Sequence, residues 1–424
     1  MNRLLVLGAG TAGTMVANQL RSRLREEDWD ITVVEPATQH LYQPGLLFVP
    51  FGRYDAKDLM KPNRSLMVEG VSLITGEVER VLPAESMVNL VDGRMLHYDQ
   101  LVIATGTHPR PDLTPGMLGP QTGRTVHEFY TPEGAQALRR VLEVWRKGKL
   151  VVHVTEPPIK CPVAPLEFAF LADDFFRNAG VRPDVDITYV TPLSGAFTKP
   201  IASEHLGGML EKRGIKVEAD FYVERVDTAS LVSYDERTVP FDLLVTVPIN
   251  MGADFVARSG FGDELNHVKV DPGTFLVAGQ SNIFALGDAA AIPTSKAGSA
   301  AHFATEVFVD NFLEHIAGRP MTRRYDGHVN CFVESGNGKA LLIDFNYDTE
   351  PLPGVYPWPP LGPLRLLEET RTNHMGKLFF KPLYWHVLLP GRHLPVTTEM
   401  SMAGKRIPGD VGLLDQTQRE EMTL

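Results

Sequence analysis

Near its start the chain alternates between a short apolar run and a helical pattern of apolar positions. Residues Arg3 to Leu7 form a continuous apolar run, Thr14 to Arg25 carry apolar residues at helical spacing, and Ile31 to Val34 form a second apolar run that ends at Glu35. Continuous apolar runs are typical of strands buried in a parallel sheet. The pattern therefore predicts a strand–helix–strand unit at the beginning of the chain.

A similar succession of elements recurs in the middle of the chain. Lys149 to Thr155 predicts a strand, Pro165 to Asn178 an amphipathic helix and Asp186 to Val190 the next strand. Two further apolar runs, Leu101 to Thr105 and Ile283 to Asp288, predict strands that end in small residues, and Ala289 to Ala291 is expected to open a helix. Repeated units of this kind predict an α/β fold with two Rossmann-like dinucleotide-binding domains.

The last part of the chain has a different pattern. Val329 to Val333 and Leu341 to Phe345 predict two strands joined by a turn at Gly336 to Gly338. The proline-rich stretch from Pro351 to Pro363 is expected to be extended and irregular. We therefore expect a C-terminal α+β region with an amphipathic membrane-binding helix. The predicted ranges are 1–110 with 275–320 for the first domain, 111–274 for the second, and 321–424 for the C-terminal region.

Composition excludes several classes of protein. The 424 residues have a formal net charge of −11, with 43% hydrophobic and 22% charged residues, which is ordinary for a globular protein and excludes intrinsic disorder. The negative net charge argues against nucleic acid as a partner, because binding to the phosphate backbone requires a basic surface. No secretory signal or transmembrane segment is evident. The 2 cysteines cannot form a disulfide framework, so they are left as one bridge, one redox pair or two free thiols.

The first predicted turn carries a nucleotide-binding pattern. Gly8, Gly10 and Gly13 follow the first strand at G-x-G-x-x-G spacing, and Glu35 ends the second strand. In this motif the glycines permit a tight turn, close approach of a pyrophosphate and close helix–strand packing, while the acid binds a ribose hydroxyl. The strand, glycines, helix and acid occur in the required order, which predicts a dinucleotide site.

Two later segments resemble the flavoproteins that have two dinucleotide-binding domains. These segments are Ala104-Thr105-Gly106 and Gly287-Asp288, each at the end of a predicted strand. The resemblance implies FAD, held by residues from distant parts of the chain. The cofactor-binding residues predicted from the glycine motif and from these segments are Gly8, Gly10, Ala12, Gly13, Glu35, Ala104, Thr105, Gly106, Gly287 and Asp288. Lys339, which belongs to a motif around Cys331, is a further predicted cofactor-binding residue.

The corresponding turn of the second predicted domain has no glycine. It reads Glu156-Pro157-Pro158-Ile159-Lys160-Cys161-Pro162. Prolines have no amide hydrogen and fix φ, so this turn is not expected to hold a pyrophosphate. The sequence therefore predicts an electron donor other than NAD(P)H. Cys161 lies in this turn, where the start of a helix and Lys160 favour the thiolate, although a buried, unreactive cysteine is an equal alternative.

At the cysteines the chain resembles the sulfide:quinone oxidoreductases. The motifs that carry the resemblance are Lys160 to Phe168, Cys331 with Gly338 to Ala340 and Asp344 to Tyr347, Gly376 to Leu378, and Tyr384 to Arg392. The resemblance implies two-electron oxidation of sulfide to sulfur or polysulfide by a Cys161–Cys331 redox pair, with Cys331 beside the flavin and Cys161 as persulfide carrier. It implies Glu167 as a proton relay and Lys377 near flavin and quinone; an ordinary exposed helix residue is the alternative for Glu167. No metal site is expected.

The chain departs from many members of that family in one respect. A third cysteine is missing from the region Thr125 to Tyr130, an arrangement similar to flavocytochrome c sulfide dehydrogenase. That relative attaches FAD through a cysteine near the position of Tyr42 to Gly45, where this chain has none, so non-covalent FAD is expected. Electron transfer to a cytochrome, or a sulfur-binding redox flavoprotein without turnover, remain alternative functions.

The segment Gly376 to Leu394 interleaves aromatic and basic residues. Its aromatic and leucine residues are Phe379, Phe380, Tyr384, Trp385, Leu388 and Leu389. Such a segment fits an anchor at the membrane interface that also lines a quinone pocket, and a helix packed on the protein's own core is the alternative. We therefore expect sulfide, a membrane quinone and the membrane surface as partners, and a peripheral membrane location. The membrane face and a homo-oligomer are left open.

Overall fold

A computed structural model describes residues 1–407 and contains two parallel five-stranded sheets. In the order of the sheet, the strands of the first are β21 (Ile283–Ala285), β9 (Gln100–Ile103), β1 (Asn2–Leu7), β2 (Trp29–Glu35) and β5 (Val71–Thr75). Leu4 to Leu7 are all buried, since helices cover both faces of such a sheet. The predicted strand–helix–strand unit is present, and α1 (Thr11–Arg23) starts directly after Gly10 and includes Gly13.

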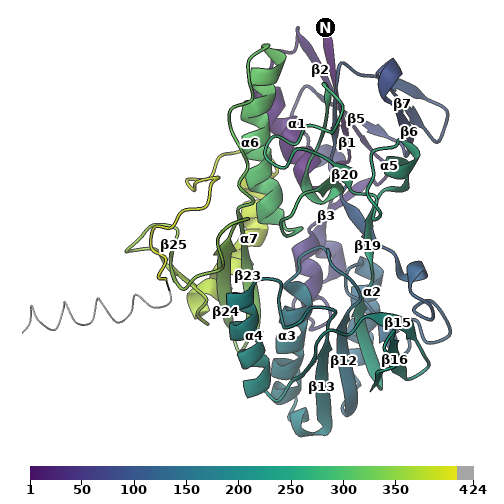
Figure 1. The fold of residues 1–424 in the computed structure, drawn as a ribbon, viewed down its shortest axis with the longest axis vertical. Coiled ribbons are helices and arrows are strands. Elements are labelled where there is room, and N and C mark those ends of the chain that lie inside the picture. Colours follow the sequence, from purple (N-terminus) through teal and green to yellow (C-terminus); the bar gives the residue numbers. More distant parts are fainter. Residues whose placement is uncertain (408–424) are drawn as a thin grey trace, which may run out of the picture.

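The second sheet repeats this topology in the middle of the chain. Its strands, in order, are β11 (Val126–His127), β18 (Leu243–Val247), β12 (Gly148–Val154), β13 (Val185–Val190) and β14 (Lys216–Glu218). The helices that accompany it are α2 (Pro132–Leu142), α3 (Ala164–Asn178) and α4 (Pro200–Lys212). In Figure 1 the first sheet fills the upper half of the molecule and the second sheet the lower half. The domain limits given above stay a prediction.

Short strands and helices complete these two halves. Three-stranded sheets are formed by β6 (Val78–Leu82), β7 (Met87–Leu90) and β8 (Met95–His97), and by β15 (Val223–Val226), β16 (Ser230–Ser233) and β17 (Thr238–Pro240). Two-stranded pairs are β3 (Gln39–Leu41) with β4 (Met60–Pro62), β10 (Thr107–Pro109) with β19 (Asn250–Gly252), and β20 (Val268–Lys269) with β22 (Ala290–Ala291). The short helix α5 (Asp254–Arg258) packs on β6.

One predicted helix start is wrong. Ala290 and Ala291 form β22, and the helix α6 (Gly298–Ile316) begins only at Gly298. Pro293 lies between them and offers no amide hydrogen, while the backbone of Ala290–Ala291 pairs with β20. The loop after Gly287-Asp288 is therefore longer than expected, and it brings Lys296 next to the turn that contains Cys161.

The C-terminal region contains the predicted hairpin. Its sheet consists of β23 (Val329–Gly336), β24 (Lys339–Phe345), β26 (Leu364–Leu366) and β25 (Gly354–Tyr356). Both α3 and α6 pack against β23, and α7 (Arg371–Leu383) packs against β24, so this region joins the two halves beside their junction (Figure 1). Residues 408–424 of the predicted C-terminal range lie outside the described residues.

Half of the segment predicted as an amphipathic membrane anchor is buried in the fold. Pro382 lies inside α7, and a π-helical turn follows at Tyr384–Leu388. Tyr384, Trp385, Leu388 and Leu389 are buried against the rest of the chain, and among the apolar residues predicted to face a membrane only Phe379 is clearly exposed. For this half of the segment the alternative, packing on the protein's own core, is correct.

Candidate active site

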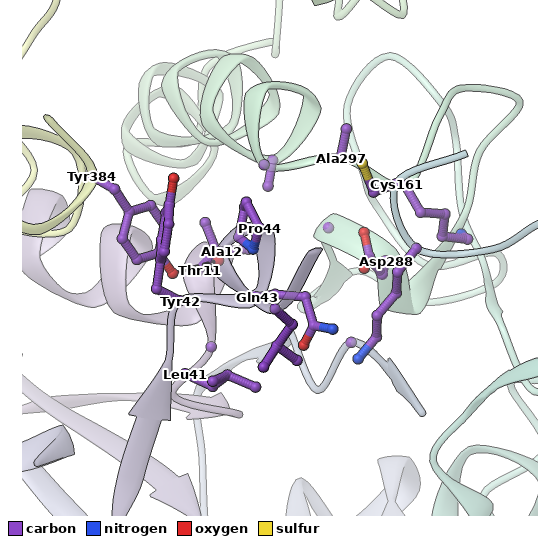
Figure 2. A pocket seen from close by; sticks show the side chains of 18 of the residues that line it. Thr11, Ala12, Leu41, Tyr42, Gln43, Pro44, Cys161, Asp288, Ala297 and Tyr384 are labelled. Atoms are coloured by element: carbon purple, nitrogen blue, oxygen red, sulfur yellow. Dashed lines mark hydrogen bonds between the residues drawn. The ribbon is translucent and has the colours of Figure 1, made fainter. Parts of the chain in front are cut away.

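One cavity of about 420 Å³ collects nearly all of the predicted site residues. It lies where the two halves of the molecule and the C-terminal region meet, and Figure 2 shows Cys161, Asp288, Thr11 and Tyr384 around it. The predicted residues that line it are Gly10, Ala12, Glu35, Ala104, Thr105, Gly106, Cys161, Glu167, Gly287, Asp288, Cys331 and Lys377. The fold therefore brings together residues that are separated by more than half of the sequence.

The three glycines of the first turn have distinct surroundings. A Cβ on Gly8 would lie 2.5 Å from the carbonyl oxygen of Ala104, and a Cβ on Gly13 would lie 1.9 Å from that of Gly8. Backbone packs directly against both positions, so neither tolerates a side chain. A Cβ on Gly10 would meet nothing within 4 Å, because Gly10 faces the cavity. This is the arrangement in which backbone can approach a pyrophosphate at a helix N-terminus.

Polar groups in the cavity wall fit a dinucleotide. The Glu35 carboxylate accepts hydrogen bonds from the amides of Ala9 (2.8 Å) and Ala37 (2.9 Å), which fixes it at the end of β2 beside the cavity. The hydroxyls of Thr105 and Thr107 are buried in the wall without a hydrogen-bond partner in the described chain. Buried hydroxyls are nearly always hydrogen-bonded, so these two groups indicate a polar ligand. The predicted FAD therefore fits the residues present.

Lys339 does not belong to this cavity. It starts β24 at the hairpin turn, where it pairs with Gly336, whereas Cys331 pairs with Ile343 farther along the ladder. The turn packs on α3, since a Cβ on Gly336 would lie 2.6 Å from the Cβ of Asp174. The expectation that Lys339 contacts the cofactor is therefore not supported by the structure. Lys339 is part of the hairpin turn and not of the cavity wall.

Several residues that line the cavity are not among the predicted catalytic and cofactor-binding residues, although the segment that contains Tyr384 was expected to line a quinone pocket. Lys296 donates a hydrogen bond of 2.9 Å to the carbonyl oxygen of Ala290 and is nearly buried. Tyr384 lies beside Tyr42 (Figure 2), with its hydroxyl 2.8 Å from that of Thr11 and 2.5 Å from Nε2 of His40. Burial lowers the pKa of His40 to about 4, so its imidazole is neutral at physiological pH. No local pattern marks these residues, because each acquires its role from a contact distant in sequence.

Both cysteines are free thiols that line the same cavity. Cys331 lies on β23 and is buried, while Cys161 lies in the turn before α3. Cys161 has φ of +49°, a left-handed conformation that is rare for residues other than glycine. Its amide donates to the carbonyl oxygen of Lys296 at 2.7 Å, and its carbonyl accepts from Ala164 at 2.9 Å. Strained backbone that is held by its neighbours is common at functional sites.

The expectation that the surroundings of Cys161 favour a thiolate is not supported. Burial raises its pKa to about 12, and the charge of Glu167 raises it further, while Lys377 acts in the opposite direction. Burial also raises the pKa of Cys331 well above its ordinary value, with a further contribution from Cys161. Both sulfurs are therefore thiols at neutral pH when reduced. The helix start and Lys160 are expected to lower the pKa of the Cys161 thiol, but loss of water around the sulfur raises it by more.

Glu167 and Lys377 form a buried ion pair beside the cysteines. The Lys377 ammonium donates to Oε1 of Glu167 at 2.6 Å and to the carbonyl oxygen of Phe332 at 3.1 Å. The side chain of Glu167 is 0% exposed, so the alternative of an ordinary exposed helix residue is wrong. Burial raises the pKa of Glu167, and Lys377 opposes that shift. Oε2 of Glu167 has no partner in the described chain and is available to exchange a proton.

Three comparisons relate the chain to known proteins. The family model for pyridine nucleotide-disulphide oxidoreductases matches residues 2–152. The mitochondrial sulfide:quinone oxidoreductase of Dictyostelium discoideum is 27% identical over 406 residues, covering 92% of this chain and 87% of that protein. The mouse (Mus musculus) mitochondrial sulfide:quinone oxidoreductase is 25% identical over 397 residues, covering 92% and 86%.

A solved structure shares the fold. The sulfide:quinone oxidoreductase from the hyperthermophilic bacterium Aquifex aeolicus superimposes with a TM-score of 0.78 at 19% identity, covering 92% of each chain. At that identity the superposition shows the fold alone, a mixed α/β architecture of the dinucleotide-binding type. The sequence similarities over nine tenths of the chain confirm the predicted resemblance and the prediction of an oxidoreductase of this kind.

Proposed function

We propose that this chain, a relative of the sulfide:quinone oxidoreductases, oxidises sulfide at Cys161 and Cys331 and passes the electrons through a flavin to a membrane quinone. The observation that carries the proposal is the cavity in which both cysteines lie beside the Glu167–Lys377 ion pair and the nucleotide-binding glycines. Each component has a separate chemical task, and together they suit thiol-based two-electron oxidation.

Residues from both ends of the chain would hold FAD. Gly10 and the start of α1 would face its pyrophosphate, Glu35 its ribose, and Asp288 its ribityl chain. When bound, FAD would accept two electrons from the cysteine site and return them to a quinone. The chain has 2 cysteines and both belong to the proposed redox pair, so we propose that FAD binds without a covalent bond.

The cysteines would carry sulfur by thiol–disulfide exchange. Hydrosulfide attacks the bridged pair, the S–S bond breaks, and Cys161 keeps the new sulfur as a persulfide while Cys331 leaves as a thiolate. The persulfide and the thiolate would then join, so that the sulfur from sulfide enters the bridge. This step releases one proton and two electrons, and FAD would accept the electrons. The strained turn at Cys161 suits this cycle, because its sulfur must alternate between two bonded partners.

Glu167 and Lys377 would manage charge during these steps. Within residues 1–407, Oε2 of Glu167 has no partner, so it can accept the proton released as sulfur enters the bridge. The Lys377 ammonium is fixed by two acceptors and would stabilise the negative charge that develops on a leaving thiolate. Because burial raises the pKa of both thiols, this cation favours a thiolate that water cannot solvate.

Anaerobic mixing with sulfide tests the proposed function. We expect sulfide to bleach the oxidised flavin absorbance of the purified protein and a quinone analogue to restore it. NADH is not expected to bleach it, because the turn from Glu156 to Pro162 lacks the glycines that hold a pyrophosphate. Rapid bleaching by NADH, or no bleaching by sulfide, would refute the proposal; transfer to a co-purifying cytochrome with no quinone reduction would favour the cytochrome-linked alternative.

A patch of exposed apolar side chains on the C-terminal region supports a peripheral membrane location. Met375 and Phe379 are 62% and 64% exposed on one face of α7, and Trp358 and Leu361 are 55% and 90% exposed in the loop between β25 and β26. This loop leads into β26, which packs on α7. Among residues 1–407, no helix has the length and apolar character needed to cross a bilayer. We propose that this patch lies on the membrane and opens the cavity to quinone.

Replacing Phe379 with glutamate tests the proposed membrane contact. Insertion of one large apolar side chain is worth roughly 1.5–3 kcal/mol, so we expect Phe379→Glu to weaken sedimentation with liposomes by about tenfold or more. Val144→Glu is the matched control, since Val144 is 76% exposed but lies after α2, away from α7. Equal liposome binding by both variants would show that this patch does not touch the membrane.

A further inference from the structure

Glu334 is a buried carboxylate that the proposed reaction does not use. It lies on β23 three residues after Cys331, and its side chain is 0% exposed. Its amide donates a hydrogen bond of 2.7 Å to Oε1 of Glu167. An ionised carboxylate in such a place is costly unless it is paired and hydrogen-bonded, so its partners indicate its role.

Those partners lead from the cavity to the surface. Nδ1 of His374 lies 2.8 Å and 3.0 Å from the two carboxylate oxygens of Glu334. Arg53, which is 35% exposed, lies 3.9 Å from the same carboxylate. His374 is 15% exposed and precedes Lys377 by one turn of α7, so both side chains project from one face of that helix. Nε2 of His374 has no hydrogen-bond partner among residues 1–407.

One member of this group has two nitrogens that can each carry a proton. The carboxylates of Glu167 and Glu334 are balanced by the permanent cations Lys377 and Arg53. His374 is the remaining member, and an imidazole can accept a proton at one ring nitrogen while it donates one from the other. Burial raises the pKa of Glu167, Lys377 opposes that shift, and the charge of Glu334 adds to the rise.

Other charged or titratable groups surround this set. The groups that face it from the neighbouring elements are Tyr54 and Arg53 before β4, Asp174 on α3, and Lys377 and Lys381 on α7. Arg53 lies 3.9 Å from Asp174, and Lys381 lies over the ring of Tyr54 with its Nζ 4.4 Å from the ring centre. Arg53 thus lies equally far from Asp174 and from Glu334, and His374 is the nearer partner of the Glu334 carboxylate.

The proposed reaction requires a proton from solvent. One hydrosulfide gives up one proton and two electrons, whereas reduction of one quinone to hydroquinone consumes two protons and two electrons. Each turnover therefore draws one further proton into a cavity whose acid, Glu167, has no exposed surface. We infer that His374 and Glu334 form the route by which this proton travels between solvent and Glu167, an inference that rests on the proposed function.

The transfers conserve protons at each step. Solvent protonates Nε2 of His374, and the hydrogen on Nδ1 passes to the Glu334 carboxylate, which restores neutral imidazole with its tautomer exchanged. Glu334 then passes its proton to Glu167, whose Oε1 accepts from the Glu334 amide and the Lys377 ammonium and whose Oε2 has no partner among the described residues. A flip of the imidazole ring about its Cβ–Cγ bond then turns the protonated nitrogen toward Glu334 and the bare nitrogen toward the partly exposed side, which resets the relay.

Two substitutions at His374 separate proton transfer from structural support. His374→Gln can still donate a hydrogen bond to Glu334 but cannot relay a proton, whereas His374→Ala does neither. We expect both to slow quinone reduction by about tenfold at pH 8, less than the loss for an acid that touches the reacting atoms, because water can partly replace the ring. The deficit should shrink as the pH falls, and imidazole should restore the rate of His374→Ala.

A measurement on the resting holoenzyme complements the rates. The infrared band of the Glu334 carboxyl group is identified as the band that is missing from Glu334→Gln. After a light-triggered pH drop, we expect this band to rise about tenfold more slowly in His374→Gln than in the unsubstituted protein. His97→Gln is the control, since His97 is exposed on β8 and does not line the cavity, so it should change neither measurement.

The outcomes distinguish the two hypotheses. If the unsubstituted protein is not bleached by sulfide, the proposed function fails. If it is bleached and His374→Gln keeps the normal rate and pH profile while only His374→Ala is slow, His374 merely supports Glu334 and the proton route is wrong. Equal infrared kinetics in all variants would likewise overturn it.

Discussion

Replacing Cys331 with serine is expected to abolish sulfide-dependent quinone reduction, by about 10³-fold or more. The serine hydroxyl occupies nearly the same volume but cannot form or break a sulfur–sulfur bond, so neither the bridge nor the leaving thiolate exists. Cys161→Ser should have a comparable effect, because it removes the sulfur that carries the persulfide. The measurement is the rate of flavin bleaching by sulfide in anaerobic rapid mixing, followed by the rate of quinone-dependent recovery.

The bound flavin provides the control for both cysteine variants. Cys331 is buried and its thiol makes no hydrogen bond within residues 1–407, so its replacement removes no bond of the described fold, and the serine variants should retain flavin and its absorbance. Retained flavin together with lost bleaching assigns the defect to sulfur chemistry. If either variant kept the full rate, a two-cysteine mechanism would be incorrect.

Removing the charge of Lys377 is expected to have the largest effect on stability. Lys377→Met leaves the Glu167 carboxylate buried, with the Glu334 amide as its one remaining partner among the described residues, and breaking one side of a buried ion pair costs about 3–5 kcal/mol. The free energy of unfolding from denaturant titration should fall by that amount. We also expect the loss to diminish at low pH, because a protonated Glu167 needs no counter-charge; burial already raises its pKa.

A double substitution separates stability from activity. Glu167→Gln with Lys377→Met removes both charges and should recover most of the lost free energy of unfolding, while sulfide oxidation stays slow. Lys381→Met is the matched control, because Lys381 lies one turn farther along α7 and contacts the ring of Tyr54 rather than a carboxylate. A loss of stability no larger than that of Lys381→Met would show that the pair at Glu167 is not significant for the fold.

Local patterns in the sequence predict the parts of this molecule that depend on neighbours in the chain. The unit from Asn2 to Glu35 and its glycines could be predicted, because strand, turn and helix signals occur within one short stretch. The hairpin around Cys331 could be predicted for the same reason. The start of α6 was misplaced, because Ala290–Ala291 forms a strand only through pairing with β20, which the sequence does not reveal.

Contacts between distant segments were predictable only where the family resemblance indicated them. Glu167 and Lys377 come from α3 and α7, 210 residues apart, and their bond follows from packing rather than from any spacing. The same resemblance suggested Lys339, which the hairpin carries away from the cavity. Burial also reversed the expected effect on the cysteine thiols, since the helix start near Cys161 acts less strongly than loss of solvent.

The residues that line the cavity come from distant parts of the chain. The order in which they are synthesised determines when the site can form. The glycine turn at the cofactor pocket is made first, but Gly287-Asp288, which packs beside it, and Cys331 follow more than 270 residues later, and Lys377 later still. A growing chain that folds from its N-terminus would therefore carry Cys161 without its partner and without a closed cofactor pocket. Cofactor capture and the ability to react with sulfide are thus acquired together, late in translation, and a prematurely ended chain would have neither.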